Sequence, residues 1–112
     1  MQVKAKYIED FIISELDKRF QDRVDDFTVT ESTDTPYTMV SIEFKMYNYF
    51  YVIFNYDRGS FGCAIINGEH GIDLESSEKW FDKADFDNFF SDLKEQIELR
   101  IPDKYLEYYG WK

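Results

Sequence analysis

The fold is decided by residues 37–66, YTMVSIEFKMYNYFYVIFNYDRGSFGCAII. Apolar and polar side chains alternate along the first third of this stretch, which is typical of a strand with one buried face. The connections at Tyr47–Asn48 and Asp57–Gly59 are too short for parallel crossovers, so we expect antiparallel neighbours. The predicted strands are 37–46, 49–56 and 61–66, with Val40, Ile42, Phe44 and Met46 on the buried face of the first.

The sheet is predicted to extend beyond this stretch in both directions. Phe27–Thr30 shows the same period of two before it. After it, Asn67–Gly68 marks a turn, and Gly71–Leu74 is compatible with a short edge strand. We therefore expect an antiparallel sheet of four or five strands.

Amphipathic helices are predicted on both sides of the sheet in the sequence. Apolar residues recur at steps of three and four from about Tyr7 to Asp22, and again after Asp85. Asp85 is a suitable N-cap, Pro102 closes this second helix or starts a new turn, and a short terminal helix is expected at 105–111. The order predicts a single α+β domain over residues 1–112, with an N-terminal helix and C-terminal helices packed on one face of the sheet.

The length and the apolar pattern also suggest a compartment. The longest apolar runs, such as Phe50–Phe54, are far shorter than the roughly 20 residues that a bilayer requires. The N-terminus lacks the charged and then apolar pattern of an export signal. Cys63 is the only cysteine, whereas small secreted domains often contain paired cysteines. These features favour a cytoplasmic protein that does not associate with a membrane.

The composition combines an excess of acid with an excess of aromatic residues. There are 23 Asp and Glu against 13 Lys and Arg, and 20% of the chain is Phe, Trp or Tyr. Acidic disordered tails contain few aromatics, so this chain is expected to fold and to present a negative field on a rigid surface. The composition favours a protein that binds a basic partner, and it opposes direct contact with nucleic acid.

Two segments hold most of the negative charge. Residues 9–34 contain nine acids and three bases, and residues 69–92 contain eight acids and two bases. In the second segment the acids are interleaved with large aromatics, a composition that offers both long-range attraction and contact area to a basic partner. The alternative is that the same acids are merely solvated and cap a helix. The predicted partner-binding residues are Glu69, Asp73, Glu75, Glu78, Trp80, Phe81, Asp82, Asp85 and Asp87.

Metal, cofactor and catalytic sites are not indicated. The acids at 82–87 lack the loop glycine and the terminal glutamate of an EF-hand, and His70 with Cys63 cannot complete a zinc site. Cys63 as a nucleophile would need His70 as its base, and a buried thiol that acts as a small apolar group is favoured instead. We therefore expect no catalytic residue, no cofactor and no enzyme activity.

Tyrosines are concentrated in and around the second and third predicted strands. In the strand 49–56, Tyr49 and Tyr51 share the face opposite Phe50, Val52 and Phe54. This face is either a set of cross-strand pairs or a recognition surface. The tyrosines concerned are Tyr37, Tyr47, Tyr49, Tyr51 and Tyr56.

The chain ends with RIPDKYL at 100–106 and Gly110–Trp111. With this ending, its acidic and aromatic composition and its helix–sheet–helix layout, it resembles small immunity proteins of bacterial toxin systems. These systems include contact-dependent inhibition and polymorphic toxins. The resemblance implies neutralisation of a cognate basic nuclease toxin by occlusion of its active or substrate-binding site. Two alternatives remain: a phage-type nucleic-acid mimic that uses the same acidic surface to inhibit a DNA-binding protein, and a secretion-chaperone-like adaptor with a helix-flanked sheet.

Overall fold

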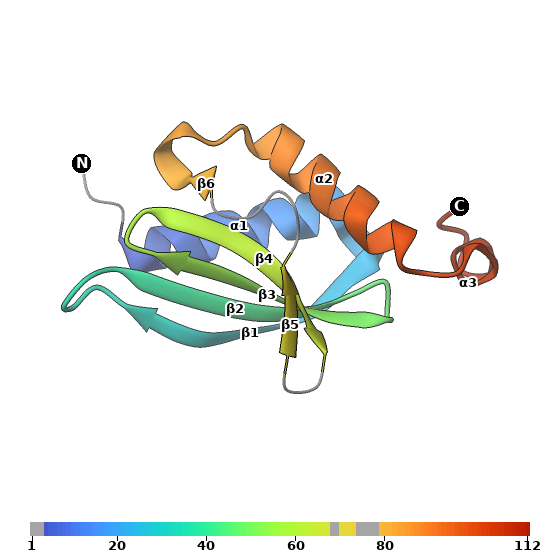
Figure 1. Cartoon of the computed structure of the whole chain (residues 1–112), viewed down its shortest axis with the longest axis horizontal. Coiled ribbons are helices and arrows are strands. Elements are labelled where there is room, and N and C mark those ends of the chain that lie inside the picture. The colour runs from blue at the N-terminus through green and yellow to red at the C-terminus, as the bar shows by residue number, and fades with distance from the viewer. Residues whose placement is uncertain (1–3, 68–69, 74–78) are drawn as a thin grey trace.

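The computed structural model describes residues 4–67, 70–73 and 79–112 and has the predicted α+β architecture (Figure 1). Four long antiparallel strands form a twisted sheet, and the two long helices lie on the same side of it (Figure 1). The helices and turns of 3-10 helix are α1 (Ala5–Phe20), η1 (Gln21–Arg23), η2 (Phe81–Lys83), α2 (Phe86–Leu99) and α3 (Asp103–Tyr108). The strands are β1 (Val24–Thr33), β2 (Met39–Met46), β3 (Phe50–Asp57), β4 (Ser60–Asn67), β5 (His70–Asp73) and β6 (Lys79–Trp80).

The strands follow one another in the sheet in chain order, from β1 to β5, and β6 adds a short pairing to β4. The turn between β3 and β4 contains Arg58 and Gly59, both with positive φ, as a tight hairpin requires. The short edge strand predicted at 71–74 is confirmed as β5 at residues 70–73, while Leu74 and the turn residue Gly68 lie outside the described residues. The sheet therefore forms the predicted antiparallel meander.

The period of two in β2 places its apolar side chains in the core, as predicted. Val40, Ile42, Phe44 and Met46 have no exposed surface. The buried stripe of α1 covers them from one side, and α2 adds a second row of apolar side chains to the same core. The stripe of α1 consists of Ala5, Ile8, Ile12, Leu16 and Phe20, and that of α2 of Phe89, Phe90, Leu93 and Ile97.

Several element boundaries differ from the prediction. β1 is longer than the predicted 27–30. The prediction was too short because two register irregularities and the positive φ of Asp26 interrupt the alternation of its side chains. The last helix begins at Asp103 rather than at residue 105, because Pro102 occupies its N-cap, and Gly110 with a φ of 77° follows its end. Within the described part of the chain, no helix is long and apolar enough to cross a bilayer.

Candidate functional site

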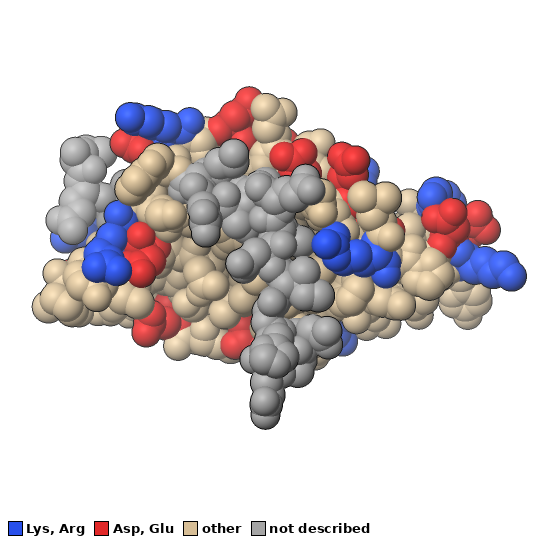
Figure 2. Space-filling view, viewed as in Figure 1, with Lys and Arg blue, Asp and Glu red and all other residues tan. Residues whose placement is uncertain are grey.

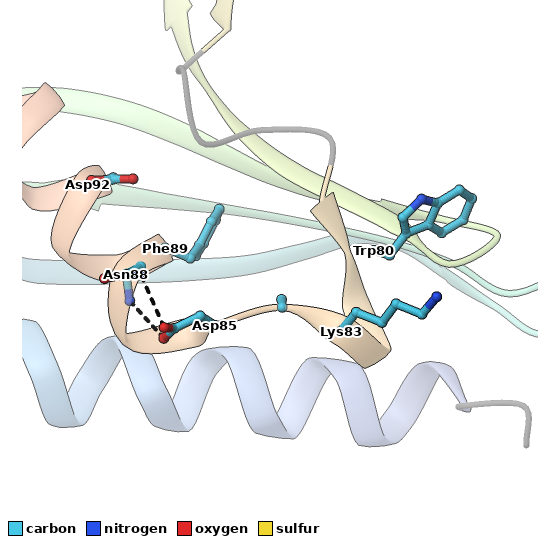
Figure 3. A pocket seen from close by; sticks show the side chains of 7 residues that line it. Trp80, Lys83, Asp85, Asn88, Phe89 and Asp92 are labelled. Atoms are coloured by element: carbon cyan, nitrogen blue, oxygen red, sulfur yellow. Dashed lines mark hydrogen bonds between the residues drawn. The ribbon is translucent and has the colours of Figure 1, made fainter.

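A cavity of about 520 Å³ opens where β6 and η2 lead into α2 (Figure 3). Trp80 and Lys83 lie on one side of it, and the first turns of α2 form the other side (Figure 3). This segment belongs to the predicted partner-binding region. The labelled lining residues are Trp80, Lys83, Asp85, Asn88, Phe89 and Asp92.

Trp80 is held at the surface by the backbone on both sides of it. It pairs with Ser60 in β4, and the next N–H, from Phe81, donates to the carbonyl of Gly59 at 2.8 Å. Its ring lies against the turn, since a Cβ at Gly59 would come within 3.2 Å of its Cζ3 atom. Nevertheless 61% of Trp80 is exposed. Trp80 is therefore a fixed aromatic side chain that is available for contact.

Phe81, the adjacent aromatic, belongs to the core. Only 8% of it is exposed. Its ring centroid lies 5.2 to 5.9 Å from those of four other rings, in edge-to-face arrangements. Of the two aromatics predicted for partner binding, only Trp80 reaches the surface. The four neighbouring rings belong to Phe11, Tyr56, Phe61 and Phe86.

Two of the predicted acids already have partners inside the protein. Asp85 caps α2: its carboxylate accepts hydrogen bonds from the backbone N–H of Asn88 at 3.1 Å and from the side-chain amide at 3.0 Å. Asp87 pairs with Arg19 of α1 at 2.7 Å. The role of Asp85 as N-cap is confirmed, and Asp87 connects the two helices. Asp85 is therefore occupied as a cap, and Asp87 is paired with a cation.

Asp82 and Asp92 are exposed, and no described residue forms an ion pair with either of them. Within the part of the chain that the structure describes, neither carboxylate is therefore paired with a cation. Burial, and after it the negative charge of Asp82, raises the pKa of the Tyr56 hydroxyl. Acidic side chains also follow α2 along the upper margin of the face seen in Figure 2. Asp92 lines the cavity but was not among the predicted residues.

The remaining predicted residues cannot be placed in this site. Glu69, Glu75 and Glu78 lie outside the described residues. Asp73 ends β5, where its backbone pairs with Ala64 of β4. The described site therefore rests on the segment from Trp80 to Asp92.

In the first acidic segment, residues 9–34, several acids have partners within the fold. Glu15 pairs with Arg19 at 3.0 Å. Asp34 accepts hydrogen bonds from the Ala5 N–H and the Thr38 hydroxyl, and the Ala5 bond is the main cause that lowers its pKa. Three acids of this segment, Asp10, Glu15 and Asp26, are therefore in ion pairs. Further acids of the segment with partners are Glu9, Asp10, Asp22 and Asp26.

The tyrosines do not form one continuous exposed face. Tyr47 and Tyr56 are buried in the core, with exposed fractions of 0% and 7%. The Tyr47 hydroxyl donates to Glu98 of α2; burial and this bond raise its pKa. Tyr49 and Tyr51 are about half exposed, at 43% and 49%. The surface tyrosines are thus fewer than the sequence suggests.

Metal binding and nucleophilic catalysis find no support in the described geometry. Among residues 4–67, 70–73 and 79–112, no group of three or more potential ligands could hold a metal ion. Cys63 is buried in β4, as predicted, and burial raises the pKa of its thiol, which opposes formation of a thiolate.

Replacement of the capping residue tests its structural role. Asp85→Ala is expected to lower the free energy of unfolding by about 0.5–2 kcal/mol, because the N–H of Asn88 loses its acceptor. Asp85→Asn should preserve most of the stability, because the amide oxygen can still accept. Urea denaturation of the two variants checks this, and equal losses would contradict the capping role.

Comparison of the chain with models of protein families gives no match. Curated proteins and solved structures likewise include no significant match. The chain is therefore described by its own features: an α+β domain with an exposed tryptophan, Trp80, and a carboxylate, Asp92, that line one cavity.

Proposed function

We propose that this protein binds and neutralises a basic protein partner, a cognate nuclease toxin, and that it acts as an immunity protein rather than as an enzyme. One observation carries the proposal: the cavity is lined by the exposed Trp80 and by Asp92, a carboxylate with no ion pair to a described residue, and η2 next to Trp80 carries the exposed Asp82. Tryptophan is enriched among the residues that dominate binding energy at protein interfaces. Free carboxylates attract a basic surface over a long range.

The proposed mechanism is occlusion. A nuclease holds the phosphates of its substrate with Lys and Arg side chains, and carboxylates of this protein would occupy the same groups. Trp80 would supply apolar contact area to the complex. Because the complex covers the groups that hold phosphate, it would exclude the nucleic acid. The net charge of −10 makes the encounter fast and dependent on salt. Protection of the producing cell from such a toxin would place the protein in the cytoplasm.

A pull-down from the native bacterium tests this function. The tagged protein is expected to retain one basic protein, identified by mass spectrometry, that elutes only at high salt. The purified partner should cleave nucleic acid, and addition of this protein at equal concentration should stop the cleavage. Recovery of no partner, with the protein running as a stable homodimer, would contradict neutralisation and favour the adaptor.

A further inference from the structure

We propose that a patch of aromatic rings at α3 binds a proline-rich segment of a protein in the polyproline II conformation. This patch lies at one end of the molecule, whereas β6 with Trp80 lies at the opposite end (Figure 1). The inference therefore concerns a second surface and goes beyond the proposed function. The ring patch consists of Tyr49, Tyr105, Tyr108, Tyr109 and Trp111.

The rings of this patch form one connected and exposed set. The ring centroid of Tyr105 lies 5.0 Å from that of Tyr49 and 4.8 Å from that of Tyr109. Tyr109 in turn contacts Tyr108 at 5.1 Å and stacks on Trp111 at 4.9 Å, with an angle of 16° between the two planes. The exposed fractions are 43% for Tyr49, 83% for Tyr108 and 43% for Tyr109. The patch thus joins the turn after β2 to α3 and offers ring surface from both.

Hydrogen bonds to the backbone fix this patch. The Tyr105 hydroxyl lies within hydrogen-bonding distance of the carbonyls of Tyr47 and Asn48, at 2.9 and 2.8 Å. The backbone N–H of Trp111 donates to the carbonyl of Leu106 at 2.8 Å. A ligand therefore meets rings that are already ordered, which lowers the entropy cost of binding.

The local charge favours a neutral ligand. In the segment 103–112 two acidic side chains face two basic ones, so their charges cancel, although the whole chain has a net charge of −10. Asp103 and Lys112 pair with each other at 2.6 Å, and the other two are Lys104 and Glu107. A charged ligand gains no net attraction from this segment. A second copy of the chain brings the same charge of −10 and is repelled.

The polar groups beside the rings favour a peptide over a neutral sugar. A sugar needs carboxylate or amide side chains next to the rings to bind its hydroxyls. Here the Asp22 carboxylate accepts the indole N–H of Trp111 at 3.3 Å, and the Asn48 side-chain oxygen accepts from the Lys45 ammonium at 3.2 Å. Both groups therefore already have a partner within the protein.

A proline-rich segment matches the groups that remain. Its proline rings pack on aromatic rings, and a polyproline II helix has no internal hydrogen bonds, so its carbonyls are free to accept. The hydroxyls of Tyr49 and Tyr108 bond to no described residue and can donate to such carbonyls. Tyrosine offers both an apolar ring and a polar tip, which suits the two parts of this ligand.

The test uses a peptide of ten prolines, with a flexible glycine–serine peptide of the same length as the neutral control. Fluorescence reports on Trp111 alone in the full chain that carries Trp80→Phe, and calorimetry on the unmodified chain repeats the measurement without that substitution. Decaproline is expected to shift the emission of Trp111 and to bind equally at low and high salt, because the ligand has no charged side chains. The glycine–serine peptide is expected not to bind.

Substitutions in the patch locate the binding. Tyr49→Ala and Tyr109→Ala are each expected to weaken decaproline binding about two- to tenfold, because each removes one ring from the contact. Tyr51→Ala is the matched control and should leave binding unchanged: Tyr51 is 49% exposed on β3, and within the described chain it contacts no ring of the patch. Tyr108→Ala is a further variant that keeps the fold, because Tyr108 is largely exposed.

Absence of decaproline binding at millimolar concentration, or equal binding of the glycine–serine peptide, would overturn the inference. So would an equal loss of binding with Tyr51→Ala, or tighter binding of maltohexaose, a neutral sugar chain, than of decaproline. The proposed function is tested by substitutions at Trp80 and in the acidic residues of η2 and α2, at the other end of the molecule. Failure of either proposal therefore leaves the other standing.

Discussion

Phe81→Ala is expected to lower the free energy of unfolding by about 3–5 kcal/mol, because it removes a ring that is packed among four others. Trp80→Ala, one position earlier, is expected to cost less than about 1 kcal/mol, because most of that side chain is exposed. Urea denaturation of the two variants measures the difference. The two substitutions thus separate an aromatic that holds the fold from one that is free to bind.

Phe81→Leu is the matched control for the first substitution. Leucine fills part of the same volume, so its cost is expected to lie well below that of alanine. Trp80→Ala, which is expected to change stability little, should weaken partner binding in a folded protein. A Phe81→Ala variant as stable as the unmodified protein would show that Phe81 of η2 does not pack in the core.

The double substitution Asp82→Lys with Asp92→Lys is expected to weaken partner binding by at least about 30-fold, because like charges then face a basic surface. The two sites are exposed and neither has an ion pair with a described residue, so stability should change little. The measurement is the dissociation constant for the recovered partner at two salt concentrations. The salt dependence should fall along with the affinity.

The matched control is Asp17→Lys with Glu31→Lys, which changes the net charge by the same amount in the first acidic segment. Both control residues are exposed, on α1 and β1, and neither has an ion pair with a described residue. A local interface predicts a much smaller loss of affinity for the control. Equal losses would indicate attraction by the overall charge and not by the cavity.

The sequence predicted the elements whose side chains are strictly periodic. β2 alternates without interruption, so its buried face followed directly from the residue order. The cap at Asp85 was predictable because a single short side chain satisfies the nearby N–H groups locally. β6 was not predicted, because two residues are too few to show any period. β1 was predicted too short, because the irregular register at Asp26 conceals its alternation.

The candidate site was predictable only as a segment. Composition identified a stretch in which acids and aromatics are mixed, but it could not distinguish Trp80 from Phe81, which have the same chemical character. Trp80 and Phe81 differ in exposure because successive residues of an extended chain point to opposite sides, and only the side of Phe81 faces the core. Similarly, Asp87 was indistinguishable from Asp92 until Arg19 of a distant helix was placed beside it.

By itself the sequence determined the α+β class, the antiparallel meander and the excess of negative charge, because periodicity, turn residues and composition are local properties. Only the tertiary structure decided which carboxylates are neutralised, which aromatic is exposed, and that Trp80 and Asp92 share one cavity. These properties depend on contacts between segments that lie far apart in the chain, such as Arg19 with Asp87 and Asp34 with Ala5. Local sequence cannot encode them, because a charge or a ring is free or occupied only relative to neighbours that folding supplies.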